Sequence, residues 1–148
     1  MASSVANVDD LAYAVMRKCC PGPFTFLLDR SRNLPKLMHD KRKTVGIRIP
    51  ECELIRAVVD GLGKPVATAS VPGCVEDLVT RGGKLLPQFG YQVSESFGHG
   101  IELILDLGEE SPAAESTILS LLDGRIELVR QGLGDASSLG FGGQGDSP

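Results

Sequence analysis

The sequence contains no run of about 18 apolar residues, which a membrane-spanning helix would need. Residues 1–10 are neither basic nor followed by a hydrophobic signal region, which argues against secretion. Positive charge is also scarce, because 15 lysines and arginines face 19 aspartates and glutamates, for a net charge of -4. This balance argues against the broad basic field of non-specific nucleic-acid binders. We expect a cytoplasmic protein without membrane contact, in which any nucleic acid binds to a local patch.

The spacing of common metal and catalytic sites is missing as well. His39 and His99 have no cysteine or carboxylate at metal-ligand spacing, so we predict no metal site. No GxSxG elbow or P-loop is present, which leaves hydrolase and P-loop NTPase activities without support. None of the four cysteines forms a CxxC pair, and we interpret all of them as buried thiols: Cys19, Cys20, Cys52 and Cys74.

The chain does have the length and apolar content of one compact domain, with 148 residues of which 42% are hydrophobic. Apolar residues recur at helical spacing over Val8–Cys19, with Asn7 or Asp9 available as the N-terminal cap. The same spacing predicts a second helix over Glu51–Leu62, which Gly63 would end.

Strand signals lie between and after these helices. Phe24–Asp29 is short, apolar and aromatic, and Thr44–Pro50 is rich in β-branched residues, with a proline that would end the hydrogen-bonded ladder of a central strand. Pro65–Ser70 is predicted as the next strand. Together with the intervening helix, the last two strands would form a parallel βαβ unit.

The second half of the chain is less regular. Glycines and prolines punctuate residues 71–100, so we expect an irregular region with at most one helix, over Val75–Arg81. Three strand-like runs follow, and Asp123-Gly124 between the last two predicts an antiparallel hairpin: Ile101–Asp106, Ser116–Leu122 and Arg125–Arg130. The Gly- and Ser-rich segment Gly134–Pro148 is predicted to be a disordered tail.

Four stretches occur in the order and spacing of the YrdC/YciO family: PGPFTFLLDRSRNLPKLMHDKRKTVGIRIP, GKPVATAS, STILSLLDG and ELVRQGLGD. The chain resembles this family over Val8–Asp135, and the basic run before TVGIRIP is typical of its YciO-like branch. The resemblance implies an α/β fold, with a twisted mixed sheet, a parallel βαβ core and a C-terminal antiparallel hairpin. It further implies that residues 1–133 are the C-terminal part of the family's domain, whose N-terminal part with the KxR motif would precede Val8.

The family's best-known members join L-threonine, bicarbonate and ATP into threonylcarbamoyl-adenylate for tRNA modification, and the family binds nucleotides and double-stranded RNA. The resemblance therefore implies ATP as substrate or ligand, with or without Mg²⁺, and RNA or tRNA as a partner. Without the KxR motif, and without the asparagine of the family's SxN motif after Ser70, the chain is expected to be inactive by itself. The alternative is a catalytically dead module that binds a protein partner or a second copy of itself.

Six positions match nucleotide-binding residues of the family: Arg48, Thr68, Ser70, Ser116, Thr117 and Arg130. Arg48 matches the arginine of the VxxRxP strand and should face the ligand cavity together with Gly46, away from Ile47 and Ile49. Glu115 replaces the proline that precedes the serine and threonine in the family. The same residues have structural interpretations: an ion pair for Arg48, small residues at a strand end for Thr68 and Ser70, and a solvated side chain for Arg130.

The densest basic run, Lys41, Arg42 and Lys43, would attract RNA through counterion release. No aromatic residue is interleaved with it to stack on bases, and a solvated loop is the competing interpretation.

Overall fold

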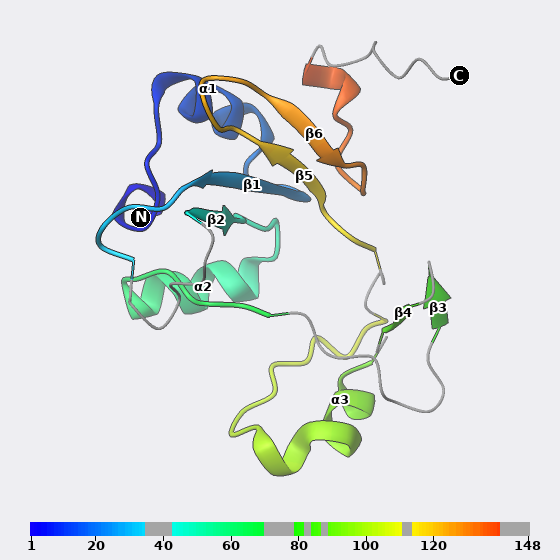
Figure 1. Cartoon of the computed structure of the whole chain (residues 1–148). Helices are drawn as coiled ribbons and strands as arrows, with labels where there is room; N and C mark the ends of the chain where they lie inside the picture. The colour runs from blue at the N-terminus through cyan, green and yellow to red at the C-terminus, as the bar shows by residue number, and fades with distance from the viewer. Residues whose placement is uncertain (35–42, 70–78, 82–83, 87–88, 111–113, 140–148) are drawn as a thin grey trace. The chain divides into compact units, whose positions relative to one another are not determined.

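The computed structural model describes residues 1–34, 43–69, 79–81, 84–86, 89–110 and 114–139 (Figure 1). The chain divides into two compact units, one formed by residues 1–66 with 115–148 and the other by residues 67–114. Among the described residues, no helix has both the length and the apolar character that crossing a membrane requires.

A mixed sheet of four strands forms the centre of the first unit: β1 (Phe24–Asp29), β2 (Thr44–Ile47), β5 (Thr117–Ser120) and β6 (Glu127–Arg130). The strand order is β2-β1-β5-β6, with β1 and β5 parallel and the two outer pairs antiparallel (Figure 1). The predicted mixed sheet is confirmed. The prediction of a central strand at Thr44–Pro50 is wrong, because β2 lies at the edge of this sheet and ends before Pro50.

Helix α1 (Asp10–Cys19) supplies one wall of the core. The carboxylate of Asp9 accepts a hydrogen bond of 2.7 Å from the backbone N–H of Ala12, so Asp9 is the cap. One cluster of buried side chains joins the helix to the sheet and comprises Ala6, Ala12, Val15, Met16, Cys19, Phe24, Phe26, Leu28, Leu119, Leu121 and Ala136. The apolar stripe of the helix thus covers one face of the sheet.

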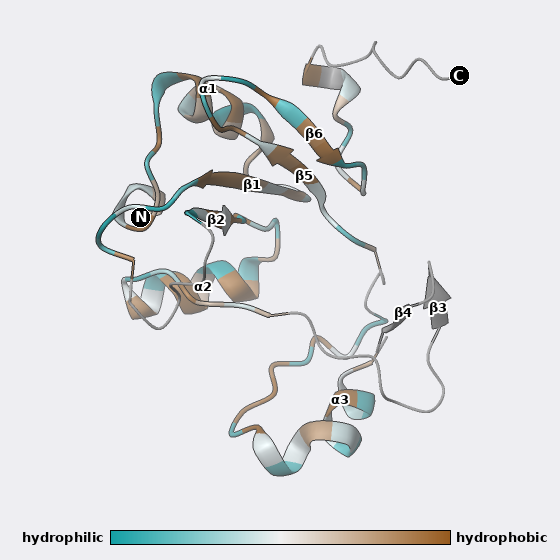
Figure 2. Ribbon diagram, viewed as in Figure 1, coloured by the Kyte–Doolittle hydropathy of each residue, from teal (hydrophilic) through white to brown (hydrophobic). Residues whose placement is uncertain are grey.

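Helix α2 (Glu53–Leu62) ends as predicted at Gly63, whose φ of 65° is left-handed and whose N–H donates to the carbonyl of Val59. The helix is amphipathic, as its alternating colours show (Figure 2), but none of its residues is fully buried. Ile55 and Leu62 are 40% and 53% exposed. Its apolar side is therefore only partly covered.

The C-terminal hairpin of β5 and β6 is confirmed, including its turn. Asp123 and Gly124 have φ angles of 54° and 66°, which is the combination that a type I′ turn requires. Two other predicted strands do not form. Residues 65–69 and Ile101–Asp106 are described without strand structure, while Ser70 lies outside the described residues. The parallel pair of the sheet is β1 with β5, and the described residues 65–69 do not pair with β2.

The second unit contains helix α3 (Gly90–Phe97) and an antiparallel pair of short strands, β3 (Val79–Arg81) and β4 (Lys84–Leu86). The expectation of an irregular region is wrong over α3. The helix expected over Val75–Arg81 is wrong for its last three residues, which form β3, and residues 75–78 lie outside the described residues. Three 3₁₀ turns complete the described elements: η1 (Ala2–Ser4), η3 (Gly98–Gly100) and η4 (Ser137–Leu139).

Residues 134–139 differ from the predicted disordered tail. Ala136 is 2% exposed and belongs to the core, and it is followed by η4. A Cβ on Gly134 would lie 2.6 Å from the ring of Phe24, so the glycine permits a close approach of the chain to that ring. Residues 140–148 lie outside the described residues.

Candidate ligand site at one end of the sheet

The two faces of the sheet differ in chemistry. Along β1, Phe24, Phe26 and Leu28 are buried in the core beside α1, so the alternating residues Thr25 and Leu27 point to the other side. The strand pairing extends this side to the neighbouring strands. We define the second face as Thr25, Leu27, Gly46, Ser116, Ile118 and Ser120. Half of its residues carry hydroxyl groups, whereas the core face is almost entirely apolar.

Thr25 and Ser116 form the polar centre of this face. Their hydroxyl oxygens are 2.7 Å apart although the residues are 91 positions apart in sequence, and either hydroxyl is able to donate. Ser116 is 7% exposed and Thr25 is half-buried. Ser116 was predicted as a ligand residue, whereas Thr25 was missed, although its place between two core phenylalanines indicates that it points away from the core.

Arg48 lies just beyond the end of β2. Ile47 and Ile49 on either side pack against the core, and the carbonyl of Ile49 accepts a hydrogen bond of 3.0 Å from the N–H of Gly22. The backbone is therefore held on both sides of Arg48, and alternation with Ile47 and Ile49 directs its side chain away from the core. The side chain is exposed and forms no ion pair or hydrogen bond with the described part of the chain. Gly46 has no side chain that would occupy the space beside Arg48. The space is open, because a Cβ on Gly46 would contact only the side chains of Thr25 and Leu27, at 3.5 and 3.8 Å.

Thr117 points in the opposite direction from its neighbour Ser116. Its side chain is 0% exposed, and its hydroxyl donates to the carbonyl of Gly134 at 2.6 Å and accepts from the N–H of Gly132 at 2.9 Å. Both functions of the hydroxyl are thus used inside the protein. We assign Thr117 to the scaffold that holds residues 132–134, and not to the ligand site that the sequence predicts for it.

Arg130 lies on the strand next to Ser116 and is half-buried. Its Nε and Nη2 atoms donate to the carbonyl of Ser116 at 3.2 and 2.8 Å, and its Nη1 atom lies 3.0 Å from the carboxylate of Glu115. Arg130 therefore lies at the same end of the sheet as Ser116, and its guanidinium already has partners there.

Thr68 is exposed and belongs to the other unit, and Ser70, Lys41 and Arg42 lie outside the described residues. Lys43 is exposed, and its carbonyl accepts a hydrogen bond from the N–H of Arg30.

Arg48, the Thr25–Ser116 pair and Arg130 all lie at one end of the sheet, where β1 and β5 begin and where β2 and β6 end (Figure 1). We call this group the arginine end. A guanidinium beside paired hydroxyls is able to hold phosphate or carboxylate oxygens through charge-assisted hydrogen bonds.

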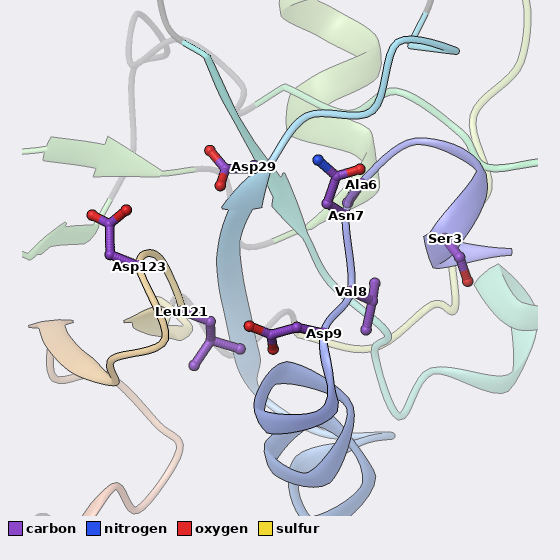
Figure 3. Close-up of a pocket in the computed structure, with 8 residues that line it drawn as sticks. All are labelled: Ser3, Ala6, Asn7, Val8, Asp9, Asp29, Leu121 and Asp123. Carbon is purple, nitrogen blue, oxygen red and sulfur yellow. The ribbon is translucent and has the colours of Figure 1, made fainter.

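The opposite end of the sheet carries a pocket that the sequence did not indicate. This cavity of about 400 Å³ is lined by Ser3, Ala6, Asn7, Val8, Asp9, Asp29, Leu121 and Asp123 (Figure 3). Its three carboxylates would repel a phosphate. Within the described residues, no three or more His, Cys, Asp or Glu side chains lie close enough together to hold a metal ion.

The described cysteines are free thiols and only partly match the prediction, since Cys19 is buried while Cys20 and Cys52 are half-buried. Burial, together with the neighbouring Cys19, raises the pKa of Cys20 to about 11. Burial also raises the pKa of Cys19, an effect that Lys18 opposes. At neutral pH both groups are protonated and poor nucleophiles.

Comparisons with known proteins agree with this fold. The chain is 28% identical to YciO of Escherichia coli K12 over 137 residues, which are 90% of this chain and 61% of YciO. The crystal structure of E. coli YciO matches with a TM-score of 0.73 at 28% identity, over 90% of this chain and 61% of that one.

Relatives named as enzymes match as well. Threonylcarbamoyl-AMP synthase of Pyrococcus abyssi is 28% identical over 126 residues, which are 85% of this chain and 35% of the enzyme. The crystal structure of P. abyssi Sua5 in complex with L-threonine matches with a TM-score of 0.71 at 26% identity, over 87% of this chain and 36% of that one. This chain thus spans only part of the length of each relative. The family model Sua5_yciO_yrdC, described as "Telomere recombination", matches residues 1–132, and the chain belongs to this family.

Proposed function

We propose that the arginine end binds a nucleotide, with ATP as the first candidate and Arg48 as its main anchor. The observation that carries this proposal is the exposed side chain of Arg48, without a partner in the described residues, on the same sheet end as the Thr25–Ser116 hydroxyls. Kinship with threonylcarbamoyl-AMP synthase, and with a Sua5 protein that has been crystallised with L-threonine, supports ATP and L-threonine as the ligands to try.

The chemistry of the residues fits such ligands. The guanidinium of Arg48 is able to present two parallel N–H donors to a phosphate or carboxylate, and Gly46 beside it adds no side chain that would occupy the space. The hydroxyl of Ser116 has Thr25 as its partner and retains capacity for a further hydrogen bond. A bound Mg²⁺ would arrive with the nucleotide phosphates, since we assign no protein ligand set to it.

Calorimetric titration of ATP and of L-threonine into wild-type, Arg48→Lys and Arg48→Met chains tests the proposal. Loss of the bidentate contact should weaken ATP binding about tenfold or more in both variants, corresponding to roughly 1.5–3 kcal/mol. Arg125→Met is the matched control, because Arg125 is an exposed arginine beside the hairpin turn at the opposite end of the sheet. Equal affinities in all four folded proteins would move Arg48 from the ligand site to the scaffold.

We further propose that the chain by itself does not make threonylcarbamoyl-AMP. Its 148 residues contain no KxR motif, and Val71 and Pro72 follow Ser70 where the family's SxN motif would have its asparagine. Loss of positioning groups removes many orders of magnitude in rate. Incubation with ATP, L-threonine and bicarbonate, followed by mass spectrometry of the nucleotides, tests this. Product formation at the rate of a full-length relative, assayed in parallel, would contradict it.

RNA is a further proposed partner, with Lys41, Arg42 and Lys43 as the contact. The support is local charge, because these adjacent residues are the densest basic run of an acidic chain and Lys43 is exposed. A filter-binding assay with a double-stranded RNA at several salt concentrations would measure both the affinity and its electrostatic part.

The competing function is a protein-interaction module. It is favoured by apolar side chains on the edge strand β6, where Leu128 and Val129 are 46% and 54% exposed, and on α2. An exposed edge with apolar side chains is a template for another chain. A mass of twice the monomer in light scattering would support a homodimer. A monomeric mass at all concentrations would rule out self-association through this edge.

A further inference from the structure

Arg130 and Glu115 form a contact that bears directly on how the arginine end selects its ligand. All three guanidinium nitrogens of Arg130 have partners: Nε and Nη2 donate to the carbonyl of Ser116, and Nη1 pairs with the carboxylate of Glu115. The carbonyl contact fixes the plane of the guanidinium, while the carboxylate occupies the edge that carries Nη1. The two side chains are 36% and 46% exposed, so a ligand from solvent is able to reach this pair.

We infer that Glu115 is a built-in competitor that occupies Arg130 and makes the site selective for polyphosphates. This inference rests on the proposed nucleotide site. A ligand gains Arg130 only by displacing a carboxylate of the same chain, which is always present beside the guanidinium at high effective concentration. A ligand with a single carboxylate offers no better contact than Glu115 does. A triphosphate offers several charges and oxygens to a guanidinium at this end of the sheet.

The charge of Glu115 also acts on the ligand itself. The Glu115 carboxylate lies beside the guanidinium of Arg130, so an incoming anion meets like charge at this end of the sheet. Removal of this charge should therefore strengthen anion binding in two ways, through the freed guanidinium and through the lost repulsion. Neutralisation of a carboxylate elsewhere on the hairpin should do neither.

The test titrates inorganic tripolyphosphate, ATP and acetate calorimetrically into wild type, Glu115→Gln and Glu127→Gln. Glu127→Gln is the matched control, because Glu127 is an exposed carboxylate at the other end of β6 and loses the same charge. Tripolyphosphate should bind Glu115→Gln about two- to tenfold more tightly than wild type, in line with the small worth of a part-exposed ion pair plus the lost repulsion. Glu127→Gln should stay close to wild type, because screening weakens distant charges.

Arg130→Gln supplies the second arm. In the Arg130→Gln background, Glu115→Gln should no longer bring the part of the gain that comes from a freed guanidinium, so its effect should shrink by at least half. In NMR spectra, the Nε–H resonance of Arg130 is identified by its absence from Arg130→Gln. This resonance should shift in Glu115→Gln before any ligand is added, and it should shift further with tripolyphosphate. An unshifted signal would mean that the ion pair does not hold Arg130.

The outcomes separate the two proposals. If Arg48→Met weakens ATP binding but Glu115→Gln leaves tripolyphosphate and ATP affinities unchanged, the nucleotide site stands and the competitor is refuted. A gain of equal size in Glu127→Gln, or an undiminished gain in the Arg130→Gln background, refutes the competitor too, because it reflects net charge alone. If neither wild type nor Glu115→Gln binds ATP or tripolyphosphate, both proposals fail together. Binding by Glu115→Gln alone would support the competitor most strongly.

Discussion

Thr117→Val is the substitution that best separates scaffold from ligand site. It keeps the shape of a buried, β-branched strand residue and removes only the hydroxyl. The N–H of Gly132 then loses its acceptor at 2.9 Å, whereas the carbonyl of Gly134 retains the side-chain amide of Gln131 at 2.6 Å. A buried N–H without an acceptor lowers the free energy of unfolding by about 1–3 kcal/mol. The carbonyl of Gly134 keeps one donor, so its loss of the other adds little. We expect a loss of about 2 kcal/mol in the free energy of unfolding.

Urea unfolding monitored by circular dichroism measures this loss as a lower midpoint at an unchanged slope. Thr25→Val is the matched control, because it makes the same change on the adjacent strand, where the threonine is half-buried and its hydroxyl pairs with one other rotatable hydroxyl, that of Ser116. It should cost about 1 kcal/mol or less. Thr117→Val should leave ATP affinity unaltered while the protein is folded. A change in stability below about 0.5 kcal/mol, or a selective loss of ATP binding, would return Thr117 to the ligand site.

Three further predictions concern the tail, the basic run and the thiols. Gly134→Ala should destabilise the fold by about 1–3 kcal/mol because its Cβ would meet the ring of Phe24 at 2.6 Å, whereas Gly61→Ala, with nothing within 4 Å in helix α2, should stabilise it by about 0.5–1 kcal/mol in the same urea assay. Neutralising Lys41–Lys43 should weaken RNA binding and flatten its salt dependence, and an unchanged slope would remove the run from RNA contact. Cys20, with a pKa of about 11, should react slowly with iodoacetamide at pH 8 and faster as the pH approaches 11, because only the thiolate attacks.

The predictions that succeeded rest on local signals. Helix α1 begins after a capping aspartate, helix α2 ends at a left-handed glycine, and the C-terminal hairpin follows from two turn residues with positive φ. Strand β1 has its predicted bounds because the apolar residues that the core requires all lie in one short, continuous segment. Such signals are complete in the sequence, since the atoms that satisfy them are only a few residues apart.

The predictions that failed depended on distant partners. Ile101–Asp106 has the composition of a strand, but no other strand pairs with it in the described residues, and Leu103 and Leu105 are 72% and 47% exposed. A strand needs the backbone of a neighbour, which composition does not reveal. The prediction of disorder over residues 134–139 rested on their glycine content. Gly134, however, is needed because the chain passes close to the ring of Phe24, so this glycine does not signal disorder.

Thr117 could have been separated from the other predicted site residues on the sequence alone. Successive side chains of a strand face opposite sides, so Ser116 and Thr117 cannot both share a face with Arg48. The alternation that placed Arg48 beside Gly46 also assigns only one of the two hydroxyls to that face. Thr25 was missed because its segment was interpreted only as core, and its contact with Ser116 spans 91 positions that no local pattern connects.

The position of the proposed site depends on charge more than on strand direction. In open α/β sheets, ligands usually bind beyond the carboxyl ends of the parallel strands, which here would be the ends of β1 and β5. That end holds the pocket of Asp9, Asp29 and Asp123, and an anion entering it would meet three carboxylates. Like charges repel, so these exposed carboxylates disfavour a polyphosphate there. The other end offers Arg48 and Arg130, so we expect the sheet to attract anions where its parallel strands begin.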